Sequence, residues 1–403
     1  MPVRLQVAVK LLVAVSASLL GASCIQHDDA VGASVIGESR DLVATQQRLS
    51  AIAERHGLDP ARYIDEPQNA IDRGSSSAIQ RLADDLRYGA TPPSSRRNWH
   101  VEDDDHSDAG DGVLRAAASD VLANQLEAMA PKHAQYEALK SRLAAVPKTD
   151  SPERRLLRIN LDRWRWMPNE LGSDYIFVNA PSFEAIIVRN GKIYARHRAI
   201  IGSRSTPTPQ FSAWASGVRV RPTWFVPQSI VRESVGSLIK NDAARAAQLG
   251  YVESKDGSIR QMPGPANALG EMILVMPNRF SVFLHDTPSK ALFNNENRAL
   301  SHGCIRIERA GEFAKALLAA PKKIDDYDAA LAAGKTKTIR FEEPIPVYIG
   351  YFTALADDAG EIRYYPDVYG FDEDVLVGLD GADLAASDRS DFEGCPLDPA
   401  TPD

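Results

Sequence analysis

The spacing of apolar residues changes near residue 150, and this change sets the fold class. Between residues 38 and 146 apolar side chains recur at intervals of three, four and seven, the pattern of one helix face. After residue 151, alternating runs at 175–179 and 185–189 precede Asn190-Gly191, the strongest short signal for a β-hairpin. The sequence therefore predicts an α+β chain, in which an N-terminal helical region is followed by a β-rich domain.

The β-rich part contains further strand patterns and two predicted helical segments. Residues 229–249 have helical spacing between strand patterns, and a glycine- and proline-rich return follows through residue 265. We expect residues 229–268 to form a helical capping insertion. A short helix is predicted at 310–318, with Phe313 and Leu317 facing inward. The other strands are expected at 192–201, 217–226, 272–276, 281–285, 347–353 and 361–365.

The N-terminus has the features of an export signal. A cationic start and Lys10 precede thirteen apolar or small residues, 11–23. That run is too short to span a bilayer core of roughly 30 Å, so we predict a cleaved export signal at 1–23. Cys24 stands where a lipoprotein is acylated, although Gly21 replaces the usual leucine. A lipid anchor on the membrane and an ordinary cleaved signal both stay open.

Composition limits the classes of protein to consider. Of the 403 residues, 44% are hydrophobic and 25% charged, as in ordinary globular domains. The net charge of −8 speaks against a nucleic-acid partner. Only three cysteines occur, and Cys395 lies in an acidic, proline-containing stretch, 372–403, that we expect to be a disordered tail. A disulfide to that tail is disfavoured, so Cys304 is predicted to be a free thiol.

An acidic segment interrupts the helical region. Residues 102–108 read Glu-Asp-Asp-Asp-His-Ser-Asp, but they lack the glycine that a calcium-binding hand requires at loop position six. We interpret this segment as a solvated acidic linker within a helical scaffold region, residues 24–150.

Cys304 has the neighbours that activate a thiol. A thiolate needs a nearby cation, histidine or aligned amides, and the sequence offers His302, Gly303 and Arg306 beside it and His285 at the end of an earlier predicted strand. If residues 301–307 are extended, alternate side chains project to one side. Amides near Gly303 would stabilise an oxyanion, and Arg306 would suit a substrate carboxylate. This pattern points to acyl transfer through a thioester.

Two other interpretations of the same residues were considered. His285, His302 and Cys304 are in principle three zinc ligands, but paired ligand spacings and a fourth ligand are missing. A purely structural cysteine is the second alternative. We favour the nucleophile, and we expect no metal and no cofactor.

These motifs resemble those of the L,D-transpeptidases, which have a YkuD-type catalytic domain. His285 stands fifteen residues before Ser301-His302-Gly303-Cys304, and the resemblance extends over roughly residues 115–371. The flanking segments are similar to the large, periplasmic Gram-negative branch of the family; they are 160–168, 178–181, 222–227, 263–270 and 284–289. That branch commonly has a peptidoglycan-binding module after its first helical region. Here residues 136–146 run almost directly into Arg154, so that module is expected to be missing.

The resemblance implies a role for each site residue. Cys304 would be the nucleophile and His285 the base, oriented by the backbone carbonyl of Asp286. The loop would supply oxyanion amides. The residues expected to orient or form the oxyanion site are Ser301, His302, Gly303 and Asp286, and those expected on the substrate side are Arg306, Trp224 and Asn267. The catalytic domain is expected at 151–371.

The resemblance also implies an activity. The cysteine would attack the carbonyl between diaminopimelate and D-alanine of a tetrapeptide stem and pass the acyl group to a second stem, forming a 3→3 crosslink. Hydrolysis at the same site, as carboxypeptidase, endopeptidase or release of a wall-anchored lipoprotein, is one alternative. A non-catalytic protein that binds the cell wall is another. Peptidoglycan stem peptides are the expected partners in each case, and protein partners are unknown.

Overall fold

The computed structural model describes residues 43–64, 75–102 and 121–381, and residues from 46 onward form one compact unit. The predicted signal, Cys24, the acidic linker from residue 103 and Cys395 lie outside the described residues. No helix in the described part of the chain is long and apolar enough to cross a membrane.

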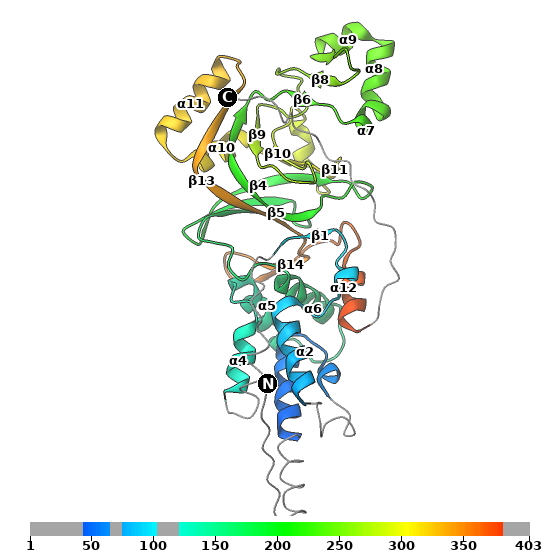
Figure 1. The fold of residues 1–403 in the computed structure, drawn as a ribbon, viewed down its shortest axis with the longest axis vertical. Coiled ribbons are helices and arrows are strands. Elements are labelled where there is room, and N and C mark those ends of the chain that lie inside the picture. The colour runs from blue at the N-terminus through cyan, green and yellow to red at the C-terminus, as the bar shows by residue number, and fades with distance from the viewer. Residues whose placement is uncertain (1–42, 65–74, 103–120, 382–403) are drawn as a thin grey trace, which may run out of the picture. The chain divides into compact units, whose positions relative to one another are not determined.

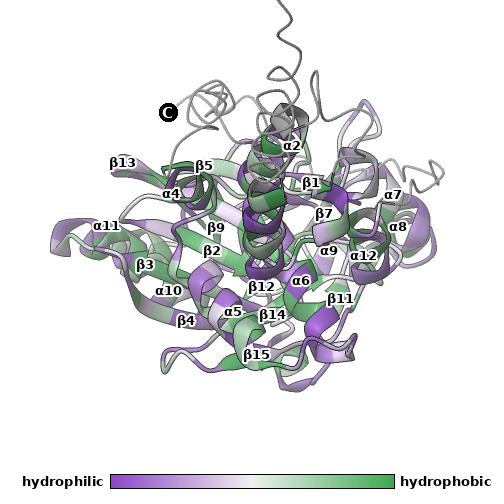
Figure 2. Ribbon diagram, turned by 90° about the horizontal axis from the view of Figure 1, so that it is seen from below, coloured by the Kyte–Doolittle hydropathy of each residue, from purple (hydrophilic) through white to green (hydrophobic). Residues whose placement is uncertain are grey.

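The N-terminal region is helical, as predicted. Residues 46–55 are helical, and α2 (Ser75–Tyr88), α4 (Leu122–Met129) and α5 (Ala134–Ala145) follow. In Figure 2, α2 carries both hydrophobic and hydrophilic residues, as an amphipathic helix should. The predicted apolar positions form one core; among them are Leu49, Ile52, Ile79, Leu82, Leu86, Leu126, Tyr136, Leu139 and Leu143.

The helical region extends further than the sequence indicated. Helix α6 (Pro152–Arg165), capped by the Ser151 side chain, contacts α5 and contributes Leu157, Leu161 and Trp164 to the same core. Helix α6 lies after the predicted domain boundary at residue 150, and it buries its apolar face in a core shared with the scaffold helices. Only residues 146–151 connect α5 to α6. No further module stands between these two helices in the described chain.

A buried ion pair fixes α6 in the scaffold. Asp162 and Arg165 are both fully buried, and Arg165 Nη1 lies 2.8 Å from Asp162 Oδ1. The Asp162 carboxylate also accepts from the backbone amides of Ala90 at 2.8 Å and Thr91 at 3.0 Å. Arg165 Nη2 donates to the Tyr136 hydroxyl at 3.0 Å. Three separate stretches of chain therefore meet at this pair.

The catalytic half is a β-sheet closed into a ring. The order is β5-β13-β2-β3-β4-β12-β10-β9, and β9 pairs again with β5. Neighbouring strands of the ring are antiparallel, except that β13 is parallel to β2 and β10 is parallel to β12. The ring strands are β2 (Tyr175–Asn179), β3 (Glu184–Arg189), β4 (Lys192–Gly202), β5 (Gln210–Val220), β9 (Met272–Val275), β10 (Leu284–His285), β12 (Ile305–Ile307) and β13 (Lys337–Gly350). Figure 1 shows this sheet next to the scaffold helices.

The predicted hairpin and short helix are both present. Asn190 and Gly191 have φ values of 50° and 70°, the left-handed conformation that a two-residue hairpin turn requires, and they join β3 to β4. Helix α10 (Ala310–Leu318) buries Phe313 and Leu317 against the sheet core. Helix α11 (Pro321–Ala332) follows it and contacts β13.

Several strands differ in extent from the prediction. The pattern at 217–226 belongs to two strands, β5 and β6 (Trp224–Phe225), separated by Arg221 at φ 52°. The expected strand at 281–285 is regular only at β10, because Ser281 has a φ of 49° and breaks the extended backbone. Strands β1 (Trp99–His100), β14 (Ala354–Ala356) and β15 (Ile362–Tyr364) complete this half.

The insertion is not purely helical, and this corrects the prediction. Short helices α7 (Gln228–Ile230), α8 (Gly236–Asn241) and α9 (Ala243–Gln248) pack with a three-stranded sheet. That sheet consists of β6, β7 (Tyr251–Glu253) and β8 (Ile259–Gln261), so the insertion begins at Trp224 rather than residue 229. A π-helical turn, Val231–Val235, joins α7 to α8. Figure 1 shows the insertion as a lobe of its own.

The start of the predicted tail is ordered. Helix α12 (Asp372–Leu379) buries Val375 and Leu379 in the scaffold core and contacts α6. Asp372 accepts a hydrogen bond from the buried Arg163 at 2.5 Å. The prediction of disorder from residue 372 is therefore wrong. The first turn of α12 contains three acidic residues, which made the segment resemble a solvated tail, but its apolar residues pack in the scaffold core. Residues 382–403 lie outside the described residues.

Candidate functional site

Cys304 lies in a tight loop between β11 (Ala299–Ser301) and β12. Strand β11 is parallel to β4 and β12 is antiparallel to it, so the chain reverses direction within residues 302–304. The assumption of an extended run through 301–307 is therefore wrong. The Cys304 side chain is only 4% exposed and borders the sheet core. It is the single free cysteine among the described residues.

Ser301 holds the cysteine loop closed from within. Its hydroxyl donates to the Cys304 carbonyl at 2.5 Å and accepts from the Gly303 amide at 3.1 Å. Gly303 has a φ of 109°, which side chains rarely permit, and this explains the glycine at the reversal. Ser301 thus joins the two sides of the loop through its hydroxyl, and its expected orienting role stays a prediction. The Gly303 amide, which we expected to face an oxyanion, donates to Ser301 instead.

Two residues that sequence reasoning missed support this loop from outside. The buried Thr208 hydroxyl donates to the Gly303 carbonyl at 2.8 Å and accepts from the Gly202 amide at 2.9 Å. The Tyr369 hydroxyl donates to the Gly202 carbonyl at 2.9 Å and accepts from the Thr208 amide at 3.2 Å. A methyl group on Gly202 would come within 3.0 Å of Gly303 Cα. The sequence contains only a weak indication that Thr208 is important, because this residue stands between two prolines. It contains no such indication for Tyr369.

His285 ends β10, beside the strand that follows the cysteine. In the parallel register Leu284 pairs with Ile305 and His285 with Arg306, so the imidazole and the thiol belong to neighbouring strand ends. His285 Nδ1 bonds the backbone carbonyl oxygen of Asp286, the expected orienting contact. Because a carbonyl oxygen only accepts, Nδ1 is assigned as the protonated nitrogen, and the ring lone pair is then on Nε2.

The surroundings of His285 keep its imidazole neutral. Burial lowers its pKa to about 4, and the charge of Arg306 acts in the same direction against weaker opposing contacts. A neutral imidazole can accept the thiol proton, as a general base must. The thiol itself donates to the Ser281 carbonyl at 3.8 Å.

The side-chain carboxylate of Asp286 has a different role from the backbone carbonyl of the same residue. Its carboxylate accepts from the Glu271 amide at 2.9 Å and pairs with Lys290, so it faces away from the imidazole. Gly270 makes this possible, since a Cβ there would come within 2.4 Å of Asp286 Oδ2. The side chain of Asp286 therefore fixes the backbone that positions His285.

The low pKa of His285 predicts the pH dependence of activity. The base is active while neutral, so activity should persist as pH falls through 6.5 and decline only near pH 4. The measurement is kcat/KM against pH. Burial also lowers the pKa of His133 to about 4, so circular dichroism at each pH must separate unfolding from titration. An acid limb near pH 6.5 in folded protein would contradict this assignment.

Thr208 offers a test of the loop's support. Thr208→Val keeps the shape but removes both hydroxyl hydrogen bonds, and a lost buried partner costs about 1–3 kcal/mol. We expect the rate of Cys304 acylation to fall about 10- to 100-fold, as such an energy implies. Thr208→Ser retains the hydroxyl and should react nearly as the parent. Equal rates for the two variants, measured by mass spectrometry with a carbapenem, would exclude the positioning role.

His302 points away from Cys304 and toward the insertion. Its Nε2 lies 2.8 Å from Glu233 Oε2 in the π-helical turn, and both side chains are about half exposed. Gly236 donates its amide to the Val231 carbonyl and closes that turn. The three side chains considered as zinc ligands do not converge, and the described residues include no cluster of three such groups able to hold a metal.

Trp224 and Asn267 have structural contacts instead of facing a substrate. Trp224 is 6% exposed and packs in the core of the insertion with Val235 and Leu269. Asn267 is 1% exposed, and its side-chain amide donates to three backbone carbonyls, including that of Pro222 at 3.1 Å. Both residues therefore hold the base of the insertion together.

The arrangement as a whole defines a class of protein. A closed β-sheet that presents a buried thiol and a neutral, oriented imidazole on adjacent strand ends is suited to acyl transfer. Residues 173–347 match the model of the YkuD family, which is described as the L,D-transpeptidase catalytic domain. Residues 38–143 match the model of a second family, which is described as a scaffold domain. The chain therefore contains a domain, residues 173–347, of the L,D-transpeptidase catalytic type.

Three individual proteins are similar to this chain. A Haemophilus influenzae protein named "Putative L,D-transpeptidase" is 28% identical over 332 residues, which cover 75% of this chain and 67% of that protein. Mycobacterium tuberculosis L,D-transpeptidase 1 is 15% identical, with 44% of this chain and 60% of that chain covered and a TM-score of 0.22. The catalytic domain of an Enterococcus faecium L,D-transpeptidase acylated by ertapenem is 14% identical, with 45% and 98% covered and a TM-score of 0.24.

Proposed function

We propose that this chain is a periplasmic L,D-transpeptidase that forms 3→3 peptidoglycan crosslinks through a thioester on Cys304. The observation that carries the proposal is the position of His285, whose Nδ1 is bound by the Asp286 carbonyl on the strand paired with β12. Such a pair supplies a nucleophile and a base without any cofactor.

The reaction divides into two acyl transfers. His285 Nε2 takes the thiol proton as Cys304 Sγ attacks the carbonyl between diaminopimelate and D-alanine. The C–N bond breaks, the proton goes to the leaving amine, and D-alanine departs, which leaves a thioester. The side-chain amine of a second diaminopimelate then attacks the thioester, His285 accepts its proton, and the thiol is restored.

Other groups of the site are assigned to charge stabilisation. The oxyanion of each tetrahedral intermediate would lie at the 302–304 loop. Because the Gly303 amide is bonded to Ser301, we assign the oxyanion contact to the other amides of this loop. Arg306, opposite His285 in the register, brings a positive charge that suits a stem-peptide carboxylate.

The N-terminal sequence supports the proposed location. The cationic and apolar N-terminus favours export to the periplasm, where peptidoglycan stems are available. Lipidation of Cys24 would attach the chain to a membrane.

A product assay tests the proposal. Purified protein is incubated with a disaccharide-tetrapeptide, and the products are separated by mass. Release of D-alanine with formation of a crosslinked dimer is the expected result. Free tripeptide without dimer would replace transpeptidation by hydrolysis at the same site. Unchanged substrate would favour the non-catalytic, wall-binding alternative.

A further inference from the structure

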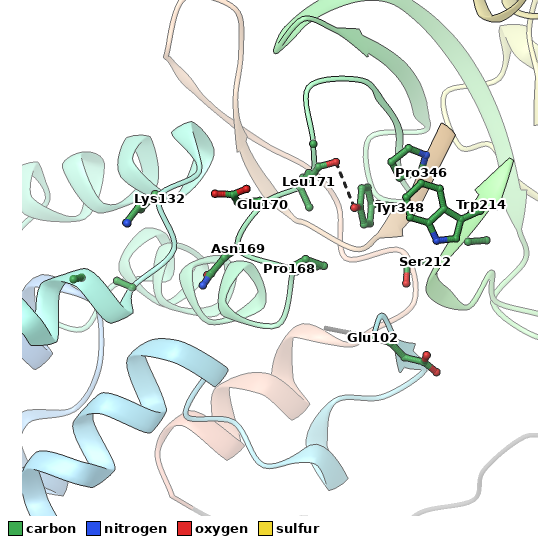
Figure 3. Close-up of a pocket in the computed structure, with 14 residues that line it drawn as sticks. Glu102, Lys132, Pro168, Asn169, Glu170, Leu171, Ser212, Trp214, Pro346 and Tyr348 are labelled. Carbon is green, nitrogen blue, oxygen red and sulfur yellow. Dashed lines mark hydrogen bonds between the residues drawn. The ribbon is translucent and has the colours of Figure 1, made fainter. Parts of the chain in front are cut away.

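A groove separate from the cysteine site runs between the scaffold and the sheet. Its volume is about 640 Å³, within the usual range for small-ligand sites. Residues 168–172, which follow α6, form one side, and β5 and β13 form another. Figure 3 shows Lys132 and Trp214 on opposite sides of it, with Glu102 at one end.

Trp214 is the most unusual residue of this groove. It lies on β5, opposite Pro346 of β13, and its side chain is 63% exposed. A tryptophan buries more apolar area than most side chains when covered, so exposure on a rigid central strand leaves a large binding surface uncovered. The flat indole face is suited to stacking on a ring with apolar C–H groups.

Both acidic and basic side chains line the groove together with the indole. Glu102, Glu170 and Lys132 line the groove, and none of them forms an ion pair with another residue in the described parts of the chain. The Asn169 Oδ1 likewise accepts no hydrogen bond there. The groove therefore offers carboxylate acceptors and an ammonium donor near one aromatic surface.

The wall beneath these groups is braced before any ligand binds. The Tyr348 hydroxyl on β13 donates to the Leu171 carbonyl at 3.4 Å, which joins the sheet to the segment after α6 (Figure 3). Residues on a rigid element pay little entropy on binding.

This combination selects one class of ligand. Two carboxylates against one ammonium make the groove net acidic, which disfavours nucleic acids and the anionic stem peptides. The mixed polar lining disfavours a lipid chain. A neutral sugar fits, since its ring stacks on an indole while its hydroxyl and acetamido groups need donors and acceptors together.

We propose that this groove binds the glycan strand of peptidoglycan through its N-acetylated hexosamine rings. The identity of the glycan rests on the proposed function, because the stem peptides that reach Cys304 are attached to such a strand. The groove would hold the polymer while the catalytic loop acts on a stem.

Binding of a peptide-free oligosaccharide tests the groove. A soluble N-acetylglucosamine hexamer is titrated into the full chain by calorimetry. We expect saturable binding that Trp214→Ala weakens at least about tenfold, or about 1.4 kcal/mol. Tyr194→Ala is the matched control, since Tyr194 is also 63% exposed but lies on β4 outside the groove. It should bind as the parent does.

The outcomes separate this proposal from the catalytic one. Carbapenem acylation of Cys304 should be equal in the parent and both variants, which also shows that they are folded. If the parent does not bind the hexamer, or if Trp214→Ala binds it equally well, the groove proposal is wrong. If the hexamer binds but the parent shows no transpeptidation or acylation, the proposed function fails and the saccharide site remains.

Discussion

Cys304→Ala is expected to abolish D-alanine release and dimer formation. The change removes the only atom at this site able to form a thioester, while the small side chain still fits the buried position. Loss of a catalytic nucleophile costs roughly 10⁶-fold in kcat where it has been measured in a serine protease. The product assay with disaccharide-tetrapeptide measures the effect. Intact-mass measurement after exposure to a carbapenem should show no adduct on the variant.

A second cysteine variant makes this test specific. Cys395→Ala removes a thiol from the acidic C-terminal segment and should leave both the products and the carbapenem adduct unchanged. Survival of dimer formation and adduct in Cys304→Ala would show that another group is the nucleophile. Loss of both in Cys395→Ala would show that the C-terminal thiol takes part.

Asp162→Ala is expected to produce the largest loss of stability. The variant leaves the Arg165 guanidinium fully buried without its carboxylate and removes the acceptor of the Ala90 and Thr91 amides. Breaking a buried pair from one side costs about 3–5 kcal/mol in the free energy of unfolding. Urea unfolding followed by tryptophan fluorescence should show a lower midpoint.

An exposed ion pair provides the comparison. Asp150 pairs with Arg155 at the surface, where both side chains are at least half exposed, so Asp150→Ala should leave the midpoint nearly unchanged. Asp162→Asn keeps one acceptor oxygen, which can serve only one of the two backbone amides, and should fall between the parent and Asp162→Ala. Similar midpoints for Asp150→Ala and Asp162→Ala would show that the buried pair does not stabilise the scaffold.

Local sequence patterns were sufficient to predict elements whose conformation depends on a specific turn or on regular spacing of apolar residues. The Asn190-Gly191 hairpin and α10 have the predicted positions, because turn conformation and helical spacing depend on nearby residues. Prediction from the sequence failed where contacts with distant segments determine whether an element is ordered. Helix α12 is acidic at its start and is ordered by packing on α6, which is far away in the sequence.

The candidate site likewise contains some residues that the sequence pointed to and others that only the structure revealed. Sequence spacing predicted Cys304 and His285 as a pair, and the strand register places them at neighbouring strand ends. Sequence reasoning could not find Thr208, whose hydroxyl bonds the cysteine loop, or Tyr369, whose hydroxyl bonds Gly202 and Thr208, because these contacts form only when distant segments come together. It also assigned Trp224 and Asn267 to substrate, although both are buried in the insertion.

The sequence by itself determined that this chain joins a helical region to a β-rich domain and contains a cysteine–histidine motif. These features depend on residue type and short-range spacing. Only the tertiary structure decided that the cysteine loop reverses direction, that His285 is held by the Asp286 carbonyl and that Trp214 lines a groove. Those features depend on strand register and on contacts between segments far apart in the chain, which local patterns do not specify.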